Sequence, residues 1–181
     1  MNWPNRLTIA RVALVPVIVV LLQFNTPVCQ GLALAAFIAA SLTDWLDGYL
    51  ARKYRIVTNL GKFLDPVADK LLVLSTMIAL SGLSRFPAWV CVVVLFRELA
   101  VDGPRLVAVE QGRVIAAGKL GKIKTMLQML ALVAVMLGEG TFGGLPVGQV
   151  LIYAAVAMTL WSGVDYFVRN GHVLWQKGGA A

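Results

Sequence analysis

Charged residues are scarce in this sequence, and acidic ones are the scarcest. Only 14% of the 181 residues are charged and nine are acidic, whereas 59% are hydrophobic. The mean hydropathy of +0.80 lies far above that of water-soluble domains. This composition excludes a soluble globular domain and predicts an integral membrane protein.

Cysteine and histidine are nearly absent as well. The two cysteines, Cys29 and Cys91, match neither a zinc-binding spacing nor a disulfide framework. The one histidine, His172, follows the last hydrophobic stretch, where we expect it to lie at the membrane surface. These shortages argue against a metal centre built from sulfur and imidazole ligands.

Long apolar runs, in contrast, fill most of the chain. A transmembrane helix needs about 20 apolar residues. The first candidate contains Arg11 and no cleavage pattern follows it, so we expect a retained helix rather than a signal peptide. Six helices leave no room for a soluble domain, which predicts that residues 1–181 form a single all-α transmembrane domain. The candidates are residues 7–23, 31–51, 62–81, 87–109, 120–138 and 147–168.

Basic residues are distributed unevenly among the connections. The connections 24–30, 82–86 and 139–146 contain only Arg85. By the positive-inside rule, both termini and the basic connections face the cytoplasm. The membrane orientation and contact with anionic lipids then account for the net charge of +7, so this charge does not indicate nucleic-acid binding. The basic residues on the cytoplasmic side are Arg6, Arg52, Lys53, Arg55, Lys62, Arg113, Lys119, Lys122, Lys124, Arg169 and Lys177.

Four of the nine acidic residues lie together at the second and third apolar stretches. At about 100° per residue, Asp44 and Asp47 share one helix face, and Asp65 and Asp69 share another. If the two helices are antiparallel neighbours, the four carboxylates converge at the cytoplasmic end. The segment reads Asp44-x-x-Asp47-Gly48-x-x-Ala51-Arg52, then eight residues, then Gly61-x-x-x-Asp65-x-x-x-Asp69.

Such a cluster requires compensation, because one Asp at the centre of a membrane helix costs about 2.5 to 3.5 kcal/mol. Carboxylates without sulfur or imidazole neighbours are hard oxygen ligands, which indicates two magnesium or manganese ions. Two such ions suit the displacement of one oxygen by another at phosphorus, and Arg52 adds a donor fork for phosphate. Two alternatives stay open: helix-end ion pairs with Arg52, Lys53, Lys62 and Lys70, and the transient site of a divalent-cation transporter.

The complete pattern of acidic and small residues resembles the signature of the CDP-alcohol phosphotransferase family. The resemblance implies transfer of a phosphatidyl-type group from a CDP-linked donor to an alcohol at the cytoplasmic membrane face, with release of CMP. It implies that Asp44, Asp47, Asp65 and Asp69 hold two divalent cations, and that Asp69 also takes the proton of the attacking hydroxyl. It further implies a homodimer. The residues expected at the nucleotide donor are Asn5, Thr8, Arg11, Gly48, Ala51, Arg52, Thr58 and Gly61.

Further segments narrow the acceptor. Asn2-x-Pro4-Asn5-x-Leu7-Thr8-x-x-Arg11, Arg97-Glu98-Leu99, Arg105 and Gly121-Lys122-x-Lys124-Thr125 resemble the phosphatidylglycerophosphate synthases of bacteria. This likeness implies CDP-diacylglycerol as donor, sn-glycerol 3-phosphate as acceptor and a location in the bacterial inner membrane. Asp102 departs from the small polar residue expected there.

The basic residues support a phosphate-bearing acceptor on physical grounds. Glycerol phosphate carries about two negative charges near neutral pH, so its site must be basic. Arg105, Lys122 and Lys124 lie at cytoplasmic helix ends and are predicted to bind it. Inositol phosphate or serine as acceptor stays open. Arg97 and Glu98 predict a buried polar network, serving either structural pairing or substrate binding.

Overall fold

A computed structural model describes the backbone of residues 3–24, 26–54, 59–110, 118–138, 141–142 and 145–171. Side chains are described within these ranges except at residues 3–5, 44–54, 59–63, 109–110, 141–142 and 145. The described chain forms six α-helices and one very short β-hairpin. The helices are α1 (Trp3–Gln23), α2 (Pro27–Tyr54), α3 (Asn59–Gly82), α4 (Trp89–Glu110), α5 (Lys119–Met136) and α6 (Val147–Asn170); the strands are β1 (Thr141–Phe142) and β2 (Leu145–Pro146).

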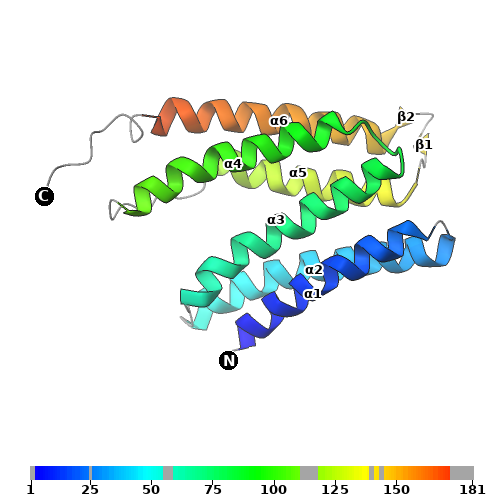
Figure 1. The fold of residues 1–181 in the computed structure, drawn as a ribbon, viewed down its shortest axis with the longest axis horizontal. Helices are drawn as coiled ribbons and strands as arrows, with labels where there is room; N and C mark the ends of the chain where they lie inside the picture. The colour runs from blue at the N-terminus through cyan, green and yellow to red at the C-terminus, as the bar shows by residue number, and fades with distance from the viewer. Residues whose placement is uncertain are drawn as a thin grey trace, which may run out of the picture.

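The helices form two groups joined along α3 (Figure 1). α1 packs on α2 and α3, whereas α6 packs on α4 and α5. Further contacts of α2 with α5, and of α3 with α4 and α5, hold the two groups together. α1 begins and α6 ends at the same end of the bundle, where α2 ends and α3 begins (Figure 1). This arrangement agrees with the predicted antiparallel pairing of the second and third helices.

A tight turn reverses the chain between α3 and α4. The Arg85 amide donates to the Leu80 carbonyl at 3.1 Å, and the Ser84 amide donates to the Ser81 carbonyl at 2.9 Å. Ser84 has a φ of 58°, so a left-handed residue ends the helix as in a Schellman motif. The turn brings α4 back beside α3, and both helices supply charged residues to the site described below.

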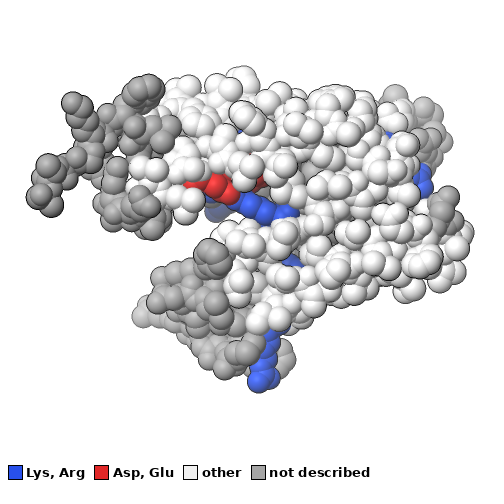
Figure 2. Space-filling model, viewed as in Figure 1, with Lys and Arg blue, Asp and Glu red and all other residues white. Residues whose placement is uncertain are grey.

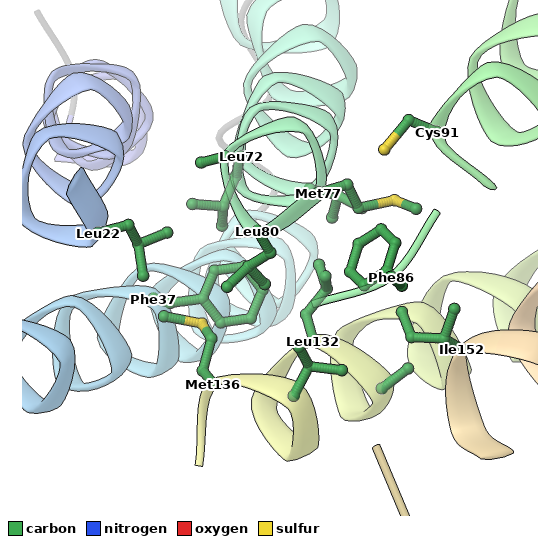
Figure 3. Close-up of a cluster of buried hydrophobic side chains, with 14 of the residues drawn as sticks. Leu22, Phe37, Leu72, Met77, Leu80, Phe86, Cys91, Leu132, Met136 and Ile152 are labelled. Atoms are coloured by element: carbon green, nitrogen blue, oxygen red, sulfur yellow. The ribbon is translucent and has the colours of Figure 1, made fainter. Parts of the chain in front are cut away.

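The apolar core occupies the half of the bundle that contains this turn. Leu22 from α1, Phe37 from α2, Leu80 from α3 and Met136 from α5 point toward one another (Figure 3) and belong to one buried cluster. In α3 and α5 these core positions lie toward the C-terminal ends, while the charged residues lie toward the N-terminal ends. The opposite half of the bundle is therefore left for a polar site.

The distribution of polarity is inverted relative to that of a water-soluble protein. Large apolar side chains such as Phe96 and Val168 are 73% and 80% exposed, while Arg11, Glu98 and Lys124 are buried. Ionisable residues in membrane helices generally turn toward the bundle interior or a water-filled cavity. The outer surface is consequently suited to lipid, and charged side chains gather in the interior.

The predicted all-α class is confirmed, and the six expected helices correspond to the six observed. Two of them, over Arg6–Gln23 and Val147–Asn170, are long and apolar enough to cross a membrane by length and composition, and Pro27–Thr43 is a shorter apolar stretch. The crossing of the membrane by all six helices stays a prediction. The expected connection at 139–146 contains a hairpin, in which Thr141 pairs with Pro146 and Phe142 with Leu145.

Candidate active site

A cavity of about 520 Å³ opens between α3, α4 and α5. Figure 2 shows acidic and basic side chains next to each other at the edge of a hollow between the two helix groups. The side chains around the cavity combine both signs of charge in an otherwise apolar protein. The charged residues that line it are Asp65, Asp69, Lys70, Arg97, Glu98, Arg105 and Lys124.

The acidic wall comes from α3. Asp65 and Asp69 are one helical turn apart, so both side chains project from one face of the helix, and both line the cavity. The Thr8 hydroxyl of α1 donates a 2.7 Å hydrogen bond to Asp65 Oδ1. Thr8 is itself buried, so this bond fixes one carboxylate oxygen from the α1 side. Asp65 and Asp69 thus lie together at one wall of the cavity, and their role as metal ligands stays a prediction.

The rest of the predicted metal and nucleotide site lies outside the described side chains. The helical backbone of α2 includes Asp44 and Asp47, but their side chains lie outside the described part of the chain. The side chains of Asn5, Ala51 and Arg52 and the whole of Thr58 also lie outside the described part of the chain, and Gly48 and Gly61 are described by their helical backbone alone.

The available ligands fit a hard divalent cation. Among the side chains that the structure describes, which do not include those of Asp44 and Asp47, no group of three or more His, Cys, Asp or Glu residues could hold a metal ion. Asp65 and Asp69 offer carboxylate oxygens to the cavity, which are the donors that magnesium and manganese prefer. The donor chemistry therefore agrees with the predicted ion, and the complete ligand set stays a prediction.

The basic wall comes from α4 and α5. Arg105 lines the cavity and its guanidinium lies over the Tyr166 ring, 5.4 Å from the centroid. Lys124 also lines the cavity and is buried. Lys122 differs, because its side chain is exposed and it is absent from the cavity lining. Of the three predicted acceptor residues, the structure thus brings Arg105 and Lys124 to the same space.

Glu98 lies at the centre of this basic wall. Its Oε1 accepts from Lys124 Nζ and, at 3.2 Å, from Arg97 Nη1. Its Oε2 is 3.9 Å from Lys70 Nζ. Arg97 Nη2 donates a 2.9 Å hydrogen bond to the Ser162 hydroxyl of α6. The predicted polar network around Arg97 and Glu98 is present, and it provides structural pairing among four helices.

Lys70 and Asp102 form a second ion pair, between α3 and α4. Sequence reasoning assigned no role to Asp102 and considered Lys70 only as a helix-end partner for the aspartates. Nothing in the spacing of the two residues, 32 positions apart, could have found this pair. Asp102 replaces the expected small polar residue with a charge that Lys70 neutralises.

Two further features of the interior support the cavity. Gln128 lines it from α5 and donates a 3.1 Å hydrogen bond to Thr159 of α6. A Cβ atom at Gly163 would come within 3.2 Å of Arg97 Cγ, so α6 makes room for the arginine by having no side chain there. Arg11, which is predicted to contact the donor, is buried with 2% of its surface exposed and does not line this cavity.

The comparisons with known proteins agree with these features. A model of the CDP-alcohol phosphatidyltransferase family matches residues 1–161. A CDP-diacylglycerol–glycerol-3-phosphate 3-phosphatidyltransferase of Bacillus subtilis (strain 168) is 43% identical over 187 residues, which cover 96% of this chain and 97% of the relative. The protein of the same name in Rickettsia bellii (strain RML369-C) is 40% identical, covering 92% and 93%. A probable phosphatidylglycerophosphate synthase of Mycobacterium tuberculosis (strain ATCC 25618 / H37Rv) is 40% identical, covering 93% and 81%.

Proposed function

Because this chain belongs to the CDP-alcohol phosphatidyltransferase family, we propose that it transfers the phosphatidyl group of CDP-diacylglycerol to sn-glycerol 3-phosphate. The products are phosphatidylglycerophosphate and CMP, and the reaction belongs to phospholipid synthesis. The observation that carries the proposal is a single cavity lined by the Asp65 and Asp69 carboxylates on one side and by Arg105 and Lys124 on the other. The names of the relatives, which specify this donor and acceptor, support it.

The acidic side of the cavity serves the donor. Asp44, Asp47, Asp65 and Asp69 would hold two magnesium or manganese ions, which offset the charge of the diphosphate and of the oxygens exchanged at phosphorus. Thr8 orients Asp65 through the 2.7 Å hydrogen bond. The remaining donor contacts are assigned to Asn5, Thr8, Arg11, Gly48, Ala51, Arg52, Thr58 and Gly61.

The basic side serves the acceptor. Arg105 presents a planar fork that matches phosphate oxygens, and Lys124 adds a compact charge within the same cavity. Lys122, exposed on the first turn of α5, attracts the anion at longer range. This division places the phosphate of the acceptor away from Asp65 and Asp69 and leaves the 1-hydroxyl of the acceptor directed at them.

The chemical step then needs one proton acceptor. Asp69 takes the proton from the 1-hydroxyl of sn-glycerol 3-phosphate, and the hydroxyl oxygen forms a bond to the phosphorus that carries diacylglycerol. The bond from that phosphorus to the bridging oxygen of the diphosphate breaks, and CMP leaves with the bridging oxygen and its electron pair. Positioning and charge compensation supply most of the rate, as in other phosphoryl transfers.

The same proposal sets the enzyme in the bacterial inner membrane. Six crossings place both termini and the cavity on the cytoplasmic side, where the soluble acceptor is available. In support, α1 begins and α6 ends at the same end of the bundle (Figure 1), and the sequence concentrates its basic residues in the connections that the positive-inside rule assigns to the cytoplasm. Membrane lipids surround the apolar outer surface, and a homodimer is the proposed assembly.

The proposed function is tested by CMP release from the purified protein in detergent with CDP-diacylglycerol and magnesium. Glycerol 3-phosphate, inositol phosphate and serine are supplied in turn. We expect release with glycerol 3-phosphate alone. Release with another acceptor would keep the chemistry and overturn the acceptor assignment, whereas no release together with metal flux into sealed vesicles would favour a divalent-cation transporter.

Arg105 gives the first prediction for a variant. We expect Arg105→Ala to raise the KM for glycerol 3-phosphate by about tenfold or more, since a charge-assisted hydrogen bond contributes about 1.5 to 3 kcal/mol. The KM for CDP-diacylglycerol should change little, and Lys122→Ala should have a smaller effect than Arg105→Ala. Arg169→Ala, which alters an exposed pair with Asp165, is the control. Equal increases in both KM values would contradict the acceptor assignment.

Thr8 gives a prediction about metal binding. Thr8→Val keeps the side-chain volume but removes the hydrogen bond to Asp65. Loss of a hydrogen bond that orients a metal ligand commonly costs 10- to 100-fold in metal affinity, so we expect the magnesium concentration for half-maximal activity to rise by about tenfold. Thr76→Val is the matched control, because that hydroxyl bonds only to the Leu72 carbonyl of its own helix. An unchanged magnesium requirement in Thr8→Val would count against Asp65 as a ligand.

A further inference from the structure

Glu98 is a buried carboxylate surrounded by cations from three helices. Its side chain is 11% exposed. Arg97 of α4, Lys124 of α5 and Lys70 of α3 all lie within ion-pair distance of it. A carboxylate and cations in a poorly solvated interior lower the free energy of the folded state only when the pairing geometry is good, so this arrangement fixes several side chains at once.

The cations around Glu98 are not equally engaged. Arg97 is held at both ends of its guanidinium, by Glu98 at 3.2 Å and by Ser162 at 2.9 Å, and Gly163 allows its stem to lie against α6. Lys70 is shared between Glu98 and Asp102. Lys124 is 4% exposed and reaches Glu98 from the facing helix. Arg97 is therefore held in one position between α4 and α6, while Lys70 and Lys124 contact Glu98 at the cavity wall.

The charges in this wall do not cancel. Among the residues of α4 and α5 that line the cavity, Arg97, Arg105 and Lys124 are basic and Glu98 is acidic. Two positive charges are left over on this wall. An acceptor phosphate carries about two negative charges near neutral pH, so the wall is complementary in charge to a phosphate monoester.

We propose that Glu98 is a positioning residue for the acceptor phosphate. It holds Lys124 and Lys70 at the wall of the cavity before the acceptor arrives, so that the phosphate meets cations that are already ordered. Such preorganisation increases affinity because the entropy of ordering long side chains is not lost on binding. The inference rests on the proposed function and adds to it a residue that touches neither substrate.

Two possible roles of Glu98 predict opposite results when its charge is removed. If Glu98 were only a competing anion, Glu98→Gln would strengthen acceptor binding, because one negative charge leaves the wall. If it positions the lysines, Glu98→Gln removes the anionic partner of the buried Lys124 ammonium, which costs free energy and displaces that side chain. The sign of the change in acceptor KM therefore distinguishes the two roles.

The test measures CMP release by the full-length protein in detergent, with each substrate varied in turn. We expect Glu98→Gln to raise the KM for glycerol 3-phosphate by at least about tenfold and to weaken competitive inhibition by inorganic phosphate in parallel. The KM for CDP-diacylglycerol should stay within about twofold of wild type. Glu98→Asp, which keeps the charge on a shorter stem, should show a smaller rise. Asp165→Asn, which removes an acid from an exposed pair on α6, is the matched control.

An acceptor KM in Glu98→Gln that is unchanged or lower, or a donor KM raised to the same extent, would overturn the proposal. If Glu98→Gln does not fold, Glu98→Asp decides the question, because an unchanged acceptor KM and phosphate inhibition there would also overturn it. Failure of the proposed function is distinguishable, since the wild-type protein would then release no CMP with glycerol 3-phosphate. If the wild type is active and Glu98→Gln has the same acceptor KM, the positioning role of Glu98 is refuted while the proposed function stands.

Discussion

Asp69→Asn is expected to lower kcat by about a hundredfold to ten-thousandfold, the contribution of a positioned general base. The amide cannot accept the proton of the acceptor hydroxyl, and it is a poorer ligand for a hard cation than a carboxylate. The side chain of Asp69 is half-buried and lines the cavity beside Lys70. Because Asn has nearly the same size and shape as Asp, the substitution should preserve the fold. Single-turnover CMP release with saturating substrates measures the chemical step directly.

Two controls accompany this variant. Asp165→Asn makes the same chemical change in an exposed i, i+4 pair on α6 and should keep the wild-type kcat. Binding of CDP-diacylglycerol to Asp69→Asn, measured without acceptor, should be partly retained because Asp65 still contributes a carboxylate. Wild-type turnover by Asp69→Asn would refute the role of Asp69 as the base.

Removal of divalent cations is expected to have an effect of similar size. Four carboxylates are predicted to hold two ions, and without them the donor's diphosphate meets a wall of like charge. We expect a chelator to reduce CMP release to background, a loss of several kcal/mol in transition-state stabilisation. Magnesium or manganese should restore activity, since both prefer oxygen ligands.

The metal experiment has a readout that does not depend on turnover. Manganese bound to the purified protein can be followed by electron paramagnetic resonance in the absence of substrates. Asp65→Ala should weaken this binding, whereas Asp165→Asn should not. Full activity in excess chelator, or restoration by zinc alone, would contradict a site built from carboxylates.

The sequence predicted the positions of the helices well because apolar runs determine them. The boundaries were less accurate where helices extend into polar sequence: α2 continues to Tyr54 and α3 starts at Asn59, beyond the expected 31–51 and 62–81. Charged residues inside α3 and α4 also lower their hydropathy. Within the described residues, α1 and α6 are long and apolar enough to cross a membrane, and buried charges are expected wherever membrane helices surround a polar site.

From the sequence, the site could be predicted within single helices but not across helix–helix contacts. Helical periodicity places Asp65 and Asp69 on one face, and both line the cavity. It could not separate the buried Lys124 from the exposed Lys122, because both lie near the start of α5 and only tertiary packing distinguishes them. The pairs of Arg97 with Ser162 and of Lys70 with Asp102 join helices that are distant in sequence. Such pairs depend on which helices are neighbours.

The most direct measurement of the central claim follows labelled glycerol 3-phosphate into lipid. Purified protein is incubated with CDP-diacylglycerol, magnesium and radiolabelled sn-glycerol 3-phosphate, and the organic extract and the released CMP are quantified together. The proposed reaction predicts labelled phosphatidylglycerophosphate in one-to-one proportion to CMP, with neither formed when chelator is present. CMP release without label in the lipid fraction would contradict it.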